Sequence, residues 1–264
     1  MKTLLCLILV IVGFSQENPR SYHQFLTING NYIQVSSDAT GFITAADIKG
    51  TIYNWNSKGT LLQSQAYAQY GRVSCIDASN PLEIFIYFRT SRKLIVLDNQ
   101  LNLKKELDFN MNQNYQVQGI GRAADGMCWV LDARERVLRK LDFTGTAIQT
   151  QMITPHLFPK KFSKILDIGN AIVISADEDS TVQIFNTALL PLRTIKKPTK
   201  PCAYYNEQLY VPHDSVSMLS ISIKTGFIDT FTVNGKPGLG QIAVYSGGMV
   251  NRTPSALSFY TRNP

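Results

Sequence analysis

The stretch ADGMCWVLDARERVLRKLDFTG, from Ala124 to Gly145, decides the fold of this chain. It contains an apolar run that ends at Asp132, a short polar turn, and a second run that ends at Asp142. The same pattern recurs about six times between Tyr22 and the C-terminus, with a period of roughly forty residues. In the clearest copies the second run closes on an Asp or Asn, at intervals of 42, 44 and 44 residues. These closing residues are Asn56, Asp98, Asp142 and Asn186.

A repeat of this length built from short strands is typical of a β-propeller, because one small sheet cannot bury both of its faces and must stack on its neighbours. Apolar runs separated by Gly, Asn, Asp and Ser clusters dominate the chain, and no segment has a convincing helical period. We therefore expect an all-β fold, a six-bladed β-propeller of four-stranded antiparallel blades.

One repeat illustrates the expected blade. Its inner strand is VSCID, from Val73 to Asp77, and its second strand runs from Glu83 to Phe88. The third strand runs from Lys93 to Asp98, and the outer strand from Leu103 to Phe109 carries most of the charge. This gradient is expected because inner strands pack near the axis and outer strands meet solvent.

The last repeat supplies an inner strand at Gln241–Tyr245 and two further strands, and the sequence then stops at Pro264 without a fourth. The strand-like segment Gln24–Ile28 precedes the first repeat and has no other place in the pattern. We predict that this N-terminal strand completes the last blade, since the pairing removes two exposed sheet edges. The alternative is a loose N-terminal tail.

The first fifteen residues resemble an export signal. Lys2 supplies a positive start, Leu4–Val12 is an apolar core, and Gly13 and Ser15 are small residues before the expected cleavage site. We expect a signal peptide over residues 1–15, one propeller domain over residues 16–264, and a location in the periplasm or outside the cell. No later segment approaches the roughly twenty apolar residues of a membrane helix.

The cysteine and charge content excludes several classes of site. Without Cys6 of the signal, Cys75, Cys128 and Cys202 remain, and their number and spacing imply neither a disulfide framework nor a zinc site. Cys75 and Cys128 lie among apolar residues and are expected to be buried. The formal net charge of +7 favours anionic partners without specifying one. We find no serine-nucleophile elbow, phosphate loop or zinc-protease motif, and we expect no cofactor.

The repeat at residues 124–145 resembles an NHL-type propeller repeat, which has a DG turn, an aromatic-aliphatic strand ending in Asp, a polar turn, and an aliphatic strand ending in Asp before Gly. The matching residues are Asp125, Gly126, Trp129, Asp132, Val137, Leu138, Asp142 and Gly145. The resemblance implies a propeller and no particular activity. The signal ending in FSQ is similar to those of envelope proteins from Gram-negative Bacteroidota.

Six-bladed sugar-lactone hydrolases also resemble this expected fold, and they hold a divalent metal at the axis through acidic and amide side chains. Asp77 and Asp167 occupy comparable places on inner strands, so one alternative is a metal-dependent hydrolase or lactonase with its site at the axis. The corresponding positions of the third and sixth repeats supply no third carboxylate. We favour structural aspartates that accept backbone N–H groups.

The expected positions of the loops predict on which face of the propeller each charged residue lies. In a propeller, the turns between the second and third strands open on the same face as the connections between blades, and this face collects twelve basic against six acidic residues. Two long connections, from Thr154 to Ser163 and from Lys196 to Cys202, add proline and an apolar tip to this basic face. The candidate binding residues are Arg92, Lys93, Arg134, Arg136, Leu157, Phe158, Lys160, Lys161, Lys164, Lys196, Lys197 and Lys200.

Long loops on a rigid scaffold are where binding usually resides. The leading hypothesis is therefore an exported, non-catalytic binding or scaffold protein that engages an anionic glycan, a glycolipid or a protein partner through this face. A partner-free set of solvated lysines is the alternative. The chain has no recognised nucleic-acid module, and we expect a monomer or a subunit of a larger complex.

Overall fold

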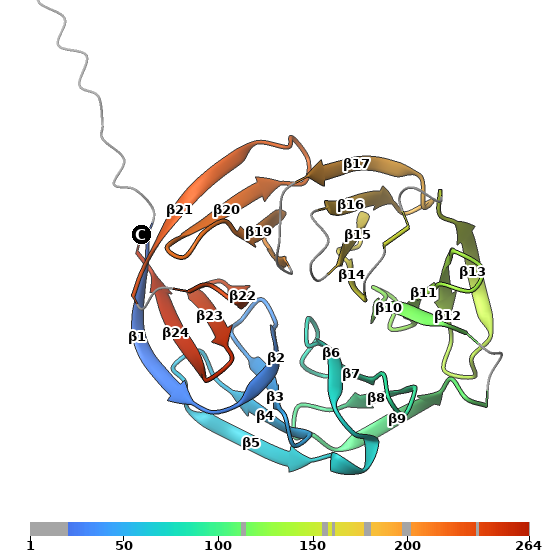
Figure 1. Cartoon of the computed structure of the whole chain (residues 1–264), viewed down its shortest axis with the longest axis horizontal. Helices are drawn as coiled ribbons and strands as arrows, with labels where there is room; N and C mark the ends of the chain where they lie inside the picture. The colour runs from blue at the N-terminus through green and yellow to red at the C-terminus, as the bar shows by residue number, and fades with distance from the viewer. Residues whose placement is uncertain are drawn as a thin grey trace, which may run out of the picture.

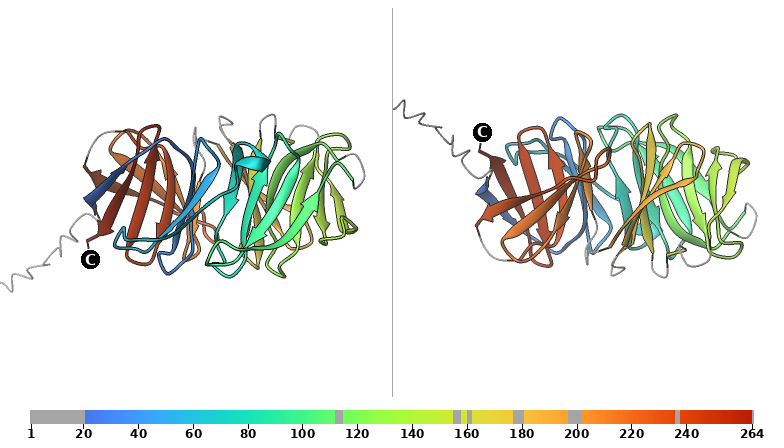
Figure 2. Two further views of the ribbon diagram at one scale, coloured as in Figure 1. Left: turned by 90° about the horizontal axis from the view of Figure 1, so that it is seen from below. Right: turned by 90° about the horizontal axis from the view of Figure 1, so that it is seen from above.

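In the computed structural model, successive strands follow one another around a central axis and form a flattened ring (Figures 1 and 2). The structure describes residues 21–111, 115–154, 158–159, 162–176, 181–196, 202–235 and 238–263. This part of the chain is all β, apart from a single 3-10 turn, η1 (Ala68–Tyr70). The expected signal, residues 1–15, lies outside the described residues.

Two sheets contain four strands each, and in both the strands are antiparallel neighbours in chain order. The first sheet contains β2 (Tyr32–Ser37), β3 (Ile43–Asp47), β4 (Thr51–Trp55) and β5 (Leu61–Ala66). The second contains β6 (Val73–Asp77), β7 (Ile84–Phe88), β8 (Lys93–Leu97) and β9 (Leu103–Asp108). These bounds lie close to those expected from the repeats, because the turn residues that end each strand are legible in the sequence.

A third sheet has eight strands and consists of two such antiparallel units joined side by side. Its first unit contains β10 (Val117–Arg122), β11 (Cys128–Asp132), β12 (Val137–Leu141) and β13 (Ala147–Met152). Its second unit contains β14 (Ser163–Asp167), β15 (Ala171–Ala176), β16 (Thr181–Asn186) and β17 (Pro191–Lys196). The two inner strands, β10 and β14, pair in parallel, with Gly119 opposite Ser163 and Ile120 opposite Lys164.

Glycine permits this close pairing of inner strands. A Cβ atom on Gly121 of β10 would overlap the carbonyl oxygen of Ile165 on β14, and one on Gly119 would approach the carbonyl oxygen of Ser163. Only a residue without a side chain lets the two backbones approach this closely. The sequence pattern did not predict that neighbouring repeats would share one sheet.

The fourth sheet, also of eight strands, brings the first and last strands of the described chain together (Figure 1). It contains β18 (Ala203–Tyr205), β19 (Gln208–Pro212), β20 (Ser217–Ser222), β21 (Ile228–Asn234), β1 (Ser21–Asn29), β24 (Ala256–Arg262), β23 (Gly248–Thr253) and β22 (Gln241–Tyr245). The N-terminal strand β1 pairs antiparallel with β24 and parallel with β21. It therefore lies between the outer strand of one unit and the last strand of the chain.

The core lies between successive four-stranded units. One hydrophobic cluster, for example, joins Ile52 of β4 to Ile76 and Phe88 of the next sheet, and a corresponding cluster fills each junction around the ring. In contrast, every residue of the outer strand β5 is exposed. Burial therefore falls from the inner strands to the rim, as expected from the charge gradient along each repeat.

The residues that close each repeat hold the turn into the outer strand. A side-chain oxygen of Asp98 accepts the backbone N–H groups of Gln100 and Asn102 at 2.9 and 2.8 Å. Asp142 does the same for Thr144 and Thr146 at 2.8 and 2.9 Å. Asn56 accepts the corresponding pair of N–H groups in its own turn. An Asp or Asn recurs at this position because its short side chain satisfies donors of the turn that follows.

The three cysteines of the described chain are buried and form no disulfide, and their burial confirms the expectation for Cys75 and Cys128. Burial raises the pKa of the Cys128 and Cys202 thiols. A thiol that stays protonated is a poor nucleophile, so these residues act as small core side chains.

Candidate anion-binding cleft

An open cleft of about 440 Å³ lies between the second and third four-stranded units. The residues that give it its polar character come from the β7–β8 loop, the connection from β9 to β10, the start of β10, and the β11–β12 loop. They are Arg89, Arg92, Tyr115, Gln116, Gln118 and Arg134. In an antiparallel unit these segments open on one face of the ring, which is the face that the sequence assigns as basic.

Arg92 is held in place by the backbone of its surroundings. It adopts a left-handed conformation with φ of 55°, and its carbonyl oxygen accepts the N–H of Phe109 at 3.0 Å. Its Nη2 atom donates to the carbonyl oxygen of Tyr115 at 2.7 Å and to that of Phe109 at 3.4 Å. These neutral acceptors fix the guanidinium group without cancelling its charge.

The loops that carry Arg134 and Gln116 are tied to one buried carboxylate. Oδ1 of Asp132, which is 1% exposed, accepts the backbone N–H of Arg134 at 3.0 Å and that of Gln116 at 3.1 Å. Oδ2 of the same residue lies 3.5 Å from Nε of Arg139. Asp132 is therefore engaged by Arg139 and by the backbone, and the guanidinium group of Arg134 lies at the exposed end of the loop.

Arg89 stands over an aromatic stack at the other side of the cleft. Its guanidinium carbon lies 5.8 Å from the centre of the Phe162 ring, which stacks on the ring of Tyr87 with an interplanar angle of 3°. Burial raises the pKa of Tyr87, although the charges of Arg92 and Arg89 act in the opposite direction. The phenol is therefore neutral at physiological pH and adds no negative charge to the cleft.

Three arginines thus line one open site. Within the described part of the chain, no carboxylate forms an ion pair with Arg89, Arg92 or Arg134. Arginine binds carboxylate and phosphate oxygens through two parallel hydrogen bonds, and such charge-assisted bonds are stronger than neutral ones. Gln116 and Gln118 add amide groups that both donate and accept. The arrangement suits a ligand with more than one anionic oxygen.

Other predicted residues lie elsewhere. Lys93 forms ion pairs with Glu106 at 2.6 Å and Asp108 at 3.4 Å, so its charge is satisfied within its own sheet. Arg136 is an exposed turn residue that does not line the cleft, and Lys164 lines the axial cavity instead. Phe158 differs from the expected exposed tip, because it packs against the core cluster that includes Trp129.

The remaining members of the predicted set lie outside the described residues or end a strand. Leu157, Lys160, Lys161, Lys197 and Lys200 belong to the part of the chain that the structure does not describe. Lys196 is the last residue of β17.

Arg89 is one of the twelve basic residues that the repeat pattern assigns to the basic face, but it is not among the candidate binding residues, and neither are Tyr115, Gln116 and Gln118. The available signal was positional, since Arg89 and Arg134 both follow the second strand of adjacent repeats. Cations in equivalent loops of neighbouring repeats lie side by side in a ring.

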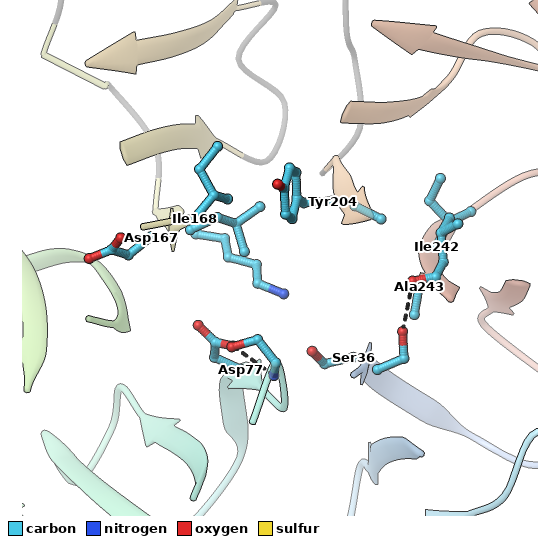
Figure 3. Close-up of a pocket in the computed structure, with 13 residues that line it drawn as sticks. Ser36, Asp77, Asp167, Ile168, Tyr204, Ile242 and Ala243 are labelled. Atoms are coloured by element: carbon cyan, nitrogen blue, oxygen red, sulfur yellow. Dashed lines mark hydrogen bonds between the residues drawn. The ribbon is translucent and has the colours of Figure 1, made fainter. Parts of the chain in front are cut away.

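The axial cavity is small, about 60 Å³ (Figure 3). Its lining includes Asp77 and Asp167 together with Ser36, Lys164 and Tyr204. A space of this size accommodates a few water molecules and no lactone or sugar substrate.

The two axial aspartates bind N–H groups of neighbouring segments. Asp77 accepts the N–H of Ser79 through Oδ1 and that of Arg122 through Oδ2, both at 3.1 Å. Asp167 accepts the N–H of Gly169 through Oδ1, and its Oδ2 accepts the N–H of Ala124 at 3.0 Å and the indole Nε1–H of Trp129 at 2.8 Å. All four oxygens are engaged, and among the described residues no group of three acidic, His or Cys side chains is placed to hold a metal ion. These residues do not fit a catalytic metal centre.

Comparisons with known proteins place the fold. No family model matches the chain, and no curated protein matches its sequence. Among solved structures, the β-propeller domain of Cps50 (Swd1) from Myceliophteria thermophila aligns with a TM-score of 0.64 and 11% identity, over 91% of this chain and 99% of that one. A streptogramin B lyase aligns with a TM-score of 0.59 and 12% identity, over 92% and 97% of the two chains.

A virginiamycin B lyase from Staphylococcus aureus, solved with quinupristin, aligns with a TM-score of 0.57 and 13% identity, over 86% of this chain and 81% of that one. The chain has a β-propeller fold. At such low identity the likeness extends to the fold alone. No helix within the described ranges has the length and apolar character needed to cross a membrane.

Proposed function

We propose that this protein is an exported, non-catalytic binding or scaffold propeller that holds an anionic partner in the cleft between its second and third four-stranded units. The observation that carries the proposal is that Arg89, Arg92 and Arg134 all line that cleft, without a carboxylate partner among the described residues. The partner class is a phosphate- or carboxylate-bearing glycan, a glycolipid or an acidic protein surface, and the protein acts as a monomer or as one subunit of a complex.

The proposal includes six blades in a single domain over residues 16–264, closed by the N-terminal strand. The six hydrophobic clusters at successive junctions support this number. The pairing of β1 with both β21 and β24 supports the closure. Export to the periplasm or the exterior rests on the signal-like residues 1–15, and the NHL-type character rests on the repeat at residues 124–145.

A binding role agrees better with the site than hydrolysis does. The cleft contains fixed cations, aromatic rings and amides, and the described lining residues include no carboxylate, histidine or thiol for proton transfer or nucleophilic attack. At the axis, both aspartates are engaged in hydrogen bonds that join neighbouring segments. Affinity would come from bidentate contacts to the arginines and would weaken with salt, because the cleft is open to solvent.

Isothermal titration calorimetry tests the proposal with citrate and pyrophosphate as probes. We expect saturable binding, weakened about tenfold or more by Arg89→Glu with Arg134→Glu, because repulsion replaces two charge-assisted contacts. The double variant Lys104→Glu with Lys224→Glu changes the charge by the same amount at exposed residues that line neither this cleft nor any other described pocket, and it should leave the affinity unaltered. Thermal unfolding of each variant controls for folding. Equal binding by the wild type and the double variant would refute the site.

A further inference from the structure

A second cleft, of about 350 Å³, lies on the opposite face of the ring. Its lining comes from β1, the β4–β5 loop, the β22–β23 turn and the end of β24. The loops between first and second strands and between third and fourth strands open on this face, so the second cleft is separate from the arginine cleft. The residues that define it are Phe25, Lys58, Tyr245, Gly247, Tyr260 and Thr261.

A β-bulge presents Phe25 to this cleft. The pairing of β1 with β24 runs from Gln24 opposite Tyr260 directly to Leu26 opposite Phe259, which leaves Phe25 without a partner in the ladder. Phe25 is 48% exposed although it is a large aromatic residue, and its ring meets that of Phe259 edge-on at 6.3 Å. Bulges re-aim side chains and occur preferentially beside functional sites. The bulge therefore exposes the aromatic ring of Phe25 at one side of the cleft.

Two tyrosines line the same cleft and are held rigidly. Tyr245 and Tyr260 are 3% and 1% exposed, so only a small part of each ring faces the open space. The hydroxyl group of Tyr245 donates to the carbonyl oxygen of Ser57 at 3.4 Å, and that of Tyr260 donates to Oε1 of Gln24 at 3.3 Å. Three aromatic residues from three strands thus meet around one space without needing rearrangement.

The rim of the cleft is polar. Lys58 and Thr261 are exposed at its edge, and within the described chain Lys58 has no ion-pair partner. Gly247 is exposed as well, and a Cβ atom added there would meet nothing within 4 Å. A purely apolar occupant would cover the ammonium and hydroxyl groups without replacing their hydrogen bonds to water, which is costly.

We propose that this second cleft binds a short acidic saccharide. The apolar C–H face of a pyranose ring packs on the exposed ring of Phe25, with Tyr245 and Tyr260 forming the base of the cleft. Hydroxyl groups of the sugar bond to Ser57 and Thr261, and a carboxylate on the sugar pairs with Lys58. The cleft volume lies at the lower end of the range for small-ligand sites. This site is independent of the arginine cleft, and it stands if the proposed function fails.

Saturation-transfer NMR with digalacturonic acid tests the site, with cellobiose as the neutral counterpart. We expect transfer to the ring protons of digalacturonic acid and a weaker signal for cellobiose. Phe25→Ala should weaken binding about fivefold, because one stacking partner is lost. Gly247→Trp should fill the cleft and abolish binding, whereas Gly247→Ala should bind as the wild type does.

Two further variants test the role of Lys58 and separate this site from the arginine cleft. Lys58→Gln should equalise the affinities for the acidic and neutral sugars, since only the charge is removed. Arg134→Glu should leave sugar binding intact, which separates this site from the arginine cleft. Thermal unfolding confirms that each variant is folded. Absence of transfer at millimolar sugar, or transfer that survives both Phe25→Ala and Gly247→Trp, would overturn the assignment.

Discussion

Asp167 shows how a structural residue can resemble a metal ligand when only the sequence is known. Its position on an inner strand is one at which a metal ligand could face the axis. In the structure, however, the carboxylate accepts hydrogen bonds from neighbouring segments. Trp129, which is 2% exposed, directs its indole N–H to Oδ2 of Asp167, and the backbone N–H of Ala124 reaches the same atom. The carboxylate joins the inner ends of two neighbouring units.

Replacement of Asp167 by Ala should therefore reduce stability. We expect the free energy of unfolding to fall by about 2 kcal/mol, because the indole N–H of the buried Trp129 loses its acceptor. Asp167→Asn should lose less, since an amide oxygen can still accept. Chemical denaturation measures both effects. A rise in the melting temperature of the wild-type protein on addition of Ca²⁺ or Zn²⁺, lost in Asp167→Ala, would contradict this role and favour a metal site.

At the scale of elements, the same turn recurs before the outer strand of several repeats, and an Asp or Asn side chain stabilises it. Burial acts to raise the pKa of Asp98, but hydrogen bonds from Asn102 and Gln100 outweigh it, and the pKa lies below its ordinary value. Hydrogen bonds from Thr144 and Thr146 likewise lower the pKa of Asp142. A carboxylate whose pKa is lowered by folding contributes stability above its unfolded pKa, and this stability is lost as pH falls through the folded pKa.

The double variant Asp98→Asn with Asp142→Asn should therefore change the pH dependence of folding. The wild type should lose stability steeply below about pH 4, the ordinary aspartate value, and the double variant should lose less over the same range. At pH 7 the two should be close, because Asn56 serves the same turn naturally. Asp98→Ala, in contrast, should cost about 1 kcal/mol at pH 7. Identical acid-unfolding curves for the wild type and the double variant would show that these turns carry no pH-linked stability.

The strands and turns also show which features of the fold could be predicted from the sequence and which could not. The strand bounds were predictable because closing residues such as Asp98 and Asp142 repeat with a period. The parallel pairing of β10 with β14 was not, since it depends on Gly119 and Gly121 facing another repeat. The ion pairs that neutralise Lys93 were also hidden, because Glu106 and Asp108 lie on a different strand. The bulge at Phe25 leaves no trace in the alternation of apolar residues.

At the scale of the whole molecule, the place of a loop within its repeat determines the face of the ring on which that loop lies. Arg89 and Arg134 are a repeat apart in the chain, yet they line one cleft because equivalent loops of neighbouring units lie side by side (Figure 1). Lys58 and Gly247 lie together on the other face, because loops between third and fourth strands and turns between first and second strands both open there. Hydrogen bonds hold Arg92 and the backbone of Arg134 in the arginine cleft, which reduces the ordering entropy that opposes binding.

The most direct test of the arginine cleft follows the guanidinium groups themselves. Protein labelled with ¹⁵N on its arginine side chains would be titrated with pyrophosphate, and the Nε–Hε resonances recorded by NMR. The cleft predicts that the resonances of Arg89, Arg92 and Arg134 shift together and saturate at one affinity, while that of Arg262, on β24, stays in place. Saturable shifts confined to other arginines, or no saturable shift at all, would contradict it.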